Sequence, residues 1–256
     1  MKIVAKNVGF LTGAAASLLM GATELHAGNI LGTVQMNTYG GVYPGNGGGE
    51  FTAVTQTGPS YLGYYNALDA TYAGGFETFC VETGVDFSGG SSYYYSLGSV
   101  AQPVGNLSYP PSTGAGVNLS AGAAWLYAEF GRGVLANFEW NYDSTRQSDD
   151  NLLQAAIWTF QGNQNYTSAY TTPATQANNV YYDAAVNALG STNAANANYT
   201  GTSVEILQMW TGEDANGNGI GPAQNQLVLV PDGGMTAGLL GIGLIGFGAL
   251  RRKLGC

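Results

Sequence analysis

The chain has 256 residues, with 16 acidic and 7 basic side chains, a single histidine and a formal net charge of −9. Most basic residues lie at the two ends, so that only Arg132 and Arg146 remain between residues 28 and 231, and that segment has no lysine. The sole histidine is His26. Because residues 28–231 contain so few cations, we do not expect them to bind nucleic acid. Because they contain no histidine, histidine-dependent nucleophilic catalysis and histidine-ligated metal sites are excluded.

The N-terminus has the order of a secretory signal. Lys2 and Lys6 precede an apolar stretch from Val8 to Met20, and small residues then continue to Ala27. This order predicts a signal peptide over residues 1–27 that is removed after Ala27. A buried N-terminal helix is the alternative, and it is less favoured because no apolar pattern continues behind the segment.

Residues 28–229 are expected to form one exported domain, because about 200 residues can bury a core of their own. Helices are predicted in its middle: one capped by Ser120 and ending at Gly131, one starting after Ser148, and one over Thr175–Leu189. The Asn/Ala-rich stretch Ser191–Gly201 is expected to be a loop. Strand-like runs are predicted at Asn29–Met36, Phe51–Gln56, Phe76–Thr83, Val204–Trp210 and Gln226–Val230.

The order of strands, helices and strands predicts an α+β fold. We expect an antiparallel β-sandwich or barrel-like sheets with two to three helices in the middle of the chain. An N-terminal signal helix and a C-terminal transmembrane helix would complete the chain.

The C-terminal residues 230–256 contain three successive signals. A short polar motif comes first, an uncharged stretch follows from Met235 to Leu250, and a basic cluster comes next. The stretch is long enough to span a bilayer at the short end of the usual range, and the basic cluster marks the cytoplasmic side. The motif is Val230-Pro231-Asp232-Gly233-Gly234, and the basic cluster is Arg251-Arg252-Lys253.

This tail resembles the VPDSG class of PEP-CTERM-like sorting tails, with Gly233 where the class has serine. The resemblance implies processing by an exosortase, a membrane transpeptidase of Gram-negative bacteria. It also implies secretion across the inner membrane, anchoring by the C-terminal helix, and then a place at the cell surface or in the extracellular matrix. A plain tail anchor that is never processed is the alternative.

Cys80 is the only cysteine of the exported segment, because Cys256 lies beyond the anchor. An unpaired cysteine in an oxidising compartment needs an explanation. A buried free thiol that packs as a small hydrophobic group is one.

The surroundings of Cys80 provide another explanation. Its segment reads Thr78-Phe79-Cys80-Val81-Glu82, and two further segments read Ala123-Ala124-Trp125-Leu126-Tyr127 and Leu152-Leu153-Gln154-Ala155-Ala156-Ile157-Trp158. Together they resemble the thioester domains of bacterial surface proteins. The resemblance implies that Cys80 supplies the thiol and Gln154 the acyl group of an internal thioester, surrounded by Phe79, Ile157 and Trp158. Leu153 stands where the family has threonine, and Gln224-Asn225-Gln226-Leu227 resembles the closing strand.

We therefore expect covalent attachment to amine-bearing partners or adhesion, without enzymatic turnover and without a cofactor or metal. The lack of lysine would keep the chain from consuming its own thioester, although an acidic exterior composition explains it equally well. Two alternatives stay open: a structural matrix or biofilm protein without a live thioester, and a carbohydrate-binding module that uses its many tyrosines. Asp214–Ile220 is similar to half of a calcium loop, but Asn225 stands where glutamate is required, which favours a polar turn.

Overall fold

The computed structural model describes residues 29–38, 48–59, 75–82, 85–101, 116–141, 144–162 and 179–231. The predicted signal peptide and the sorting tail from residue 232 onward lie outside these ranges, as do the helix and the anchor predicted for them. Among the described residues, no helix combines the length and apolar character needed to cross a membrane.

Six antiparallel strands form the main sheet in the order β3-β2-β1-β4-β7-β8. A short ribbon of two further strands, β5 and β6, lies beside it. The strands of the main sheet are β1 (Gly32–Asn37), β2 (Phe51–Thr57), β3 (Gly75–Thr78), β4 (Ser92–Gly98), β7 (Val204–Glu213) and β8 (Gly219–Leu229), and those of the ribbon are β5 (Val100–Ala101) and β6 (Val117–Asn118).

The residues that follow β3 connect the two edges of this sheet. The Val81 amide donates to the carbonyl of Asn225 at 3.0 Å, and the Leu227 amide donates to the carbonyl of Phe79 at 3.1 Å. The Thr78 hydroxyl adds a bond to the carbonyl of Leu227 at 2.5 Å. The free edge of β8 is thereby paired, and the strands close into a ring, which removes the unpaired edges of an open sheet.

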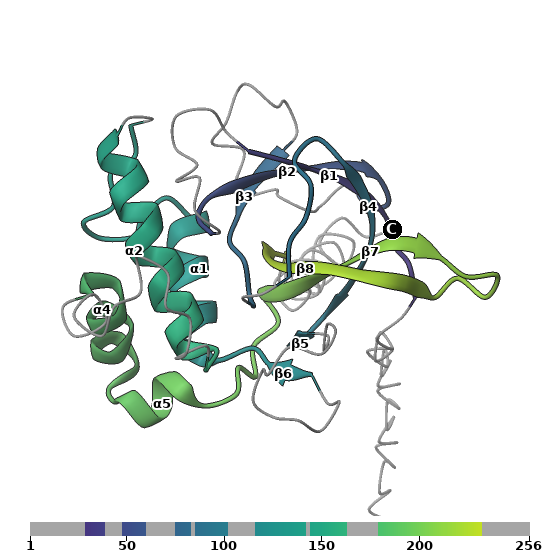
Figure 1. Ribbon diagram of the computed structural model, residues 1–256. Helices are drawn as coiled ribbons and strands as arrows, with labels where there is room; N and C mark the ends of the chain where they lie inside the picture. The colour runs from purple at the N-terminus through teal and green to yellow at the C-terminus, as the bar shows by residue number, and fades with distance from the viewer. Residues whose placement is uncertain are drawn as a thin grey trace, which may run out of the picture.

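Four described helices lie together on one side of this ring (Figure 1). They are α1 (Ala121–Gly131), α2 (Ser144–Phe160), α4 (Val180–Leu189) and α5 (Thr192–Asn196). Helix α1 packs against both α2 and the strands β7 and β8. The predicted antiparallel sheet with helices in the middle of the chain is therefore confirmed, although four helices are described where two to three were expected.

The helix ends follow local capping chemistry, with two departures from expectation. The Ser120 side chain accepts a hydrogen bond from the Ala123 amide at the start of α1, as predicted. Helix α2 begins at Ser144 rather than after Ser148. The loop predicted over Ser191–Gly201 was wrong in part, because Ser191 caps α5 and alanine favours helix.

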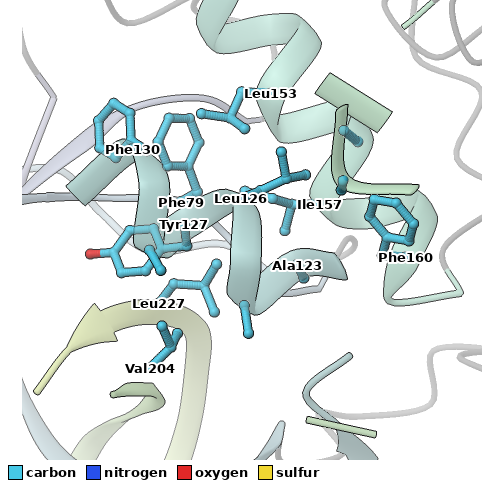
Figure 2. Close-up of a cluster of buried hydrophobic side chains, with 14 of the residues drawn as sticks. Phe79, Ala123, Leu126, Tyr127, Phe130, Leu153, Ile157, Phe160, Val204 and Leu227 are labelled. Atoms are coloured by element: carbon cyan, nitrogen blue, oxygen red, sulfur yellow. The ribbon is translucent and has the colours of Figure 1, made fainter. Parts of the chain in front are cut away.

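Buried side chains form two clusters, one on each side of β7 and β8. The helix-side core lies between the helices and these strands and includes Leu126, Ile157 and Leu227 (Figure 2). The ring core lies on the other side and includes Leu207 and Val228. Strands β7 and β8 are buried on both faces where they cross the cores, although both also contain buried polar residues, such as Gln208 of β7 and Gln226 of β8.

Candidate functional site

Cys80 and Gln154 lie in direct contact, although 74 positions separate them in the sequence. The Cys80 amide donates to Oε1 of Gln154 at 2.9 Å, and Nε2 of Gln154 donates to the Cys80 carbonyl at 2.8 Å. Cys80 lies two residues after the end of β3, and Gln154 projects from α2. The two residues are 0% and 2% exposed, so their polar groups bond to each other instead of to water.

A second backbone amide completes the surroundings of the Gln154 carbonyl oxygen. The Gly49 amide donates to Oε1 of Gln154 at 3.2 Å, beside the bond from Cys80. Gly49 has φ of 128°, a backbone conformation that residues with a Cβ rarely adopt. Two fixed N–H donors aimed at one carbonyl oxygen have the composition of an oxyanion hole, which would stabilise negative charge developing on that oxygen.

The sulfur of Cys80 contacts strand β8. Nε2 of Gln226 lies 3.6 Å from Sγ of Cys80, and the two residues form an antiparallel bridge. Burial raises the pKa of the Cys80 thiol well above its usual range, the hydrogen bond from Gln226 lowers it, and the charges of Glu82 and Asp86 raise it. The resting site therefore favours the thiol, and the amide of Gln226 is a donor that favours the thiolate.

Glu82 places a buried carboxyl group two residues after Cys80. Its Oε1 accepts a hydrogen bond from the Asn225 amide at 2.6 Å. Burial raises the pKa of Glu82 to about 8, against the lowering effect of the bonds from Asn225. Adjacent residues of β8, Asn225 and Gln226, thus bind the carboxyl of Glu82 and the thiol of Cys80. A carboxyl with this pKa can take up and release a proton near neutral pH.

One face of α2 carries a row of polar residues that leads to Gln154. Arg146, Asp150 and Gln154 follow each other at intervals of four, which places them on one side of the helix. Nε of Arg146 donates to Oε2 of Glu50 at 2.7 Å, and Nη2 of Arg146 bonds to Oε1 of the same carboxylate. Nη1 of Arg146 donates to the carbonyl of Trp140 at 2.9 Å. The bidentate pair is buried, since Arg146 is 1% and Glu50 0% exposed.

Asp150 lies between this ion pair and Gln154 on the helix, and it is fully buried. Burial raises the pKa of Asp150 to about 10, the charge of Glu50 adds to the shift, and the charge of Arg146 opposes it. Burial and the nearby Glu50 therefore favour the neutral, protonated form of Asp150.

The three residues predicted to surround the site divide between the two cores. Trp158 belongs to the ring core together with Cys80. Phe79 and Ile157 point into the helix-side core, as does Leu153 (Figure 2). Leu153, at the position where the resemblance to thioester domains led us to expect threonine, is therefore a packing residue of the helix-side core, which also contains the apolar residues of α1.

Several residues of the site were not predicted, among them Gly49, Glu50 and Arg146. Arg146 could have been found, because it is one of two arginines in the exported segment and shares a helix face with Gln154. The segment of Gly49 and Glu50 gave no comparable signal in the sequence.

The loop between β7 and β8 is closed by its own side chains. Oδ1 of Asp214 accepts hydrogen bonds from the amides of Asn216 and Asn218, both at 2.8 Å. Bonds from Asn218 and Asn216 lower the pKa of the Asp214 carboxyl. These contacts are those of a polar turn. Across the described ranges, no group of three His, Cys, Asp or Glu residues could hold a metal ion.

Comparison with protein families matches residues 230–254 to the VPDSG-CTERM motif. The predicted sorting tail is thereby confirmed, and the chain is an exported protein that is sorted to the envelope through its C-terminal tail. The tail implies processing by an exosortase-type enzyme. Of the motif, Val230 and Pro231 are described, and Val230 is buried directly after β8. No curated protein and no solved structure matches the chain.

Proposed function

We propose that the exported domain forms an internal thioester between Sγ of Cys80 and Cδ of Gln154, and that this bond attaches the protein covalently to an amine-bearing partner at the cell surface. The observation that supports the proposal best is the paired contact between the Gln154 carboxamide and the Cys80 backbone. It holds the acyl group next to the residue that carries the only thiol of the exported segment.

The bond would form without any oxidant. The Cys80 thiol loses its proton, its sulfur bonds to Cδ of Gln154, and the bond between Cδ and Nε2 breaks. Nε2 takes up the proton and leaves as ammonia. Charge that develops on Oε1 during this step is met by the amides of Cys80 and Gly49, at 2.9 and 3.2 Å.

Reaction with a partner would take place at the same carbon, with an amine replacing the sulfur. The partner's amine bonds to Cδ, the bond to sulfur breaks, and Cys80 regains a proton as a free thiol. The product is an amide that links the partner to the side chain of residue 154. One event per molecule is the result, which distinguishes attachment from enzymatic turnover.

The trypsin sites of this chain allow a direct test. Arg132 and Arg146 both lie between Cys80 and Gln154, and residues 28–231 contain no lysine. We expect the protein purified from envelopes, denatured and digested with trypsin without added thiols, to give two large fragments that stay covalently joined. Hydroxylamine should separate them, and Cys80→Ala should never give the joined product. Fragments that separate without hydroxylamine, together with a freely alkylated Cys80 and an unmodified Gln154 carboxamide, would contradict the proposal.

A structural envelope protein without a live thioester is the second candidate. It is favoured by the burial that raises the pKa of the Cys80 thiol, because thiolate is the reactive form. The same digestion distinguishes the two. A glycan-binding surface built on tyrosine has less support, since no tyrosine among the described residues is exposed.

A further inference from the structure

The hydrogen bond from the Gly49 amide to Gln154 requires that the backbone at residues 49 and 50 be fixed in position against helix α2. Gly49 and Gln154 are 105 positions apart in the sequence. The residue that follows Gly49 is Glu50, whose carboxylate is bound by Arg146 of α2 at 2.7 Å and through a second nitrogen. The segment is therefore attached to α2 twice, by a side chain at Glu50 and by the amide of Gly49.

We infer that the ion pair of Glu50 and Arg146 positions the Gly49 amide on the carbonyl oxygen of Gln154, and so acts as a clamp for formation of the thioester. The inference rests on the proposed function. Glu50 and Arg146 are positioning residues, because neither contacts the atoms that would react.

The geometry of the clamp favours a positioning role over a contribution to stability alone. A bidentate arginine–carboxylate pair fixes both distance and orientation, which a single hydrogen bond does not. A buried ion pair adds little net stability compared with apolar residues of the same size, because desolvation offsets its attraction. Arg146 is also held from its other side by the carbonyl of Trp140 and lies over the ring of Phe138, 5.4 Å from its centre.

Asp150 bears on the pairing of Glu50 with Arg146. It occupies the helix position between Arg146 and Gln154 and is fully buried. A second carboxylate there would compete with Glu50 for the single arginine. The raised pKa of Asp150 favours its neutral form, which reduces this competition.

The test compares the two arginines of the exported segment. Arg132 pairs with Glu129 on the surface at 3.4 Å, and its side chain is 49% exposed. We expect Arg146→Gln to slow formation of the joined fragments by about 10²–10³-fold, the effect of losing one oxyanion donor. Arg132→Gln should form them at the wild-type rate. Each variant keeps one trypsin site between Cys80 and Gln154, so the same digestion measures both.

If Arg146→Gln does not fold, a double variant and hydrogen exchange test the clamp in its place. The double variant Glu50→Gln/Arg146→Met replaces the buried pair by residues of similar size, and its circular dichroism establishes folding. In a Cys80→Ala background, hydrogen exchange of the Gly49 amide should become at least tenfold faster in the double variant, whereas that of the residue 80 amide stays within a factor of three.

The outcomes separate the two proposals. A wild-type protein without joined fragments and with an unmodified Gln154 overturns the thioester, while faster exchange at Gly49 in the double variant still supports the clamp. Joined fragments that form at the wild-type rate in a folded double variant, with unchanged exchange at Gly49, overturn the clamp and leave the thioester in place.

Discussion

The side-chain amide of Gln154 pairs with the backbone of Cys80 through two hydrogen bonds, at 2.9 and 2.8 Å, in the manner of one strand residue pairing with another. A carboxamide bound in this way cannot rotate, because its donor and its acceptor are both engaged. The carboxamide carried by α2 is thus fixed against the residue that carries the thiol, as the proposed thioester requires.

Gln226 should control the ionisation of Cys80. Replacing Gln226 by leucine removes the N–H donor at 3.6 Å from Sγ, so the pKa of the thiol should rise. The thiolate can be titrated by its ultraviolet absorbance in a Gln154→Ala background, where the thiol is free, with a Cys80→Ala variant as the blank.

Gln224 provides the matched control for that titration. It lies on the same strand and is buried, but its amide donates to the carbonyl of Glu82 at 3.2 Å. Gln224→Leu should therefore shift the pKa of the Cys80 thiol less than Gln226→Leu does. Equal curves for Gln226→Leu and the parent would rule out the bond to sulfur as a determinant.

Gly48 should tolerate no side chain. A Cβ at this position would lie 2.9 Å from Cζ2 of Trp158 and 3.0 Å from Cγ of Gln154. Gly48→Ala should therefore lower the free energy of unfolding by about 1–3 kcal/mol, the usual cost of overpacking. Gly89→Ala is the control for urea denaturation, because its Cβ would meet Thr38 at an ordinary 3.5 Å. Equal losses in both variants would argue against close packing at Gly48.

Glu82 should make the stability of the fold fall as pH rises. Its pKa is raised from 4.5 to about 8 in the folded protein, so the folded state binds the proton more tightly than the unfolded state. The stabilisation is fully present below pH 4.5 and is lost as pH rises through about 8. Glu82→Gln carries no such proton and should gain stability relative to wild type over this window, by roughly a few kcal/mol.

Urea denaturation at several pH values measures this difference for Glu82→Gln. Asp183→Asn is a suitable control, because Asp183 is an exposed acid of α4. A stability difference between Glu82→Gln and wild type that stays constant from pH 5 to 9 would contradict the assignment.

Leu153 should matter for packing and not for the chemistry of Gln154. It is fully buried in the helix-side core, so Leu153→Thr loses apolar contacts and buries a hydroxyl. We expect a loss of roughly 2–5 kcal/mol in unfolding free energy. The rate at which joined tryptic fragments form in folded protein should not change. A faster rate would show that a hydroxyl at residue 153 assists the reaction.

Local signals explain which parts of the fold could be predicted. Helix α1 was predicted at both ends, since Ser120 caps it and it ends at Gly131. Helix α2 was predicted too short, because its first turns are polar and are held by the distant pairing of Arg146 with Glu50. Propensity contains no information about such a pair. Ring closure by residues 79–81 likewise depends on contacts with β8 that no local pattern specifies.

In the candidate site, too, local sequence predicts little of what depends on contacts between distant segments. The contact of Cys80 with Gln154 was predictable only from the resemblance to thioester domains, because nothing local connects a strand cysteine to a helix glutamine. Gly49 could not be predicted, since its role depends on a backbone amide and a φ of 128° instead of on a side chain. Whether the bond between Cys80 and Gln154 forms stays a prediction.

Strand β8 runs directly into the sorting motif, which begins at Val230. Mechanical tension on a tethered tail would therefore enter the fold through β8. This strand is hydrogen-bonded along both edges, to β7 on one side and to residues 79–81 on the other. A pull along its axis loads both rows in shear, so that many bonds must break together. A covalent link from Cys80 to α2 would pass part of that force from the sheet to the helices.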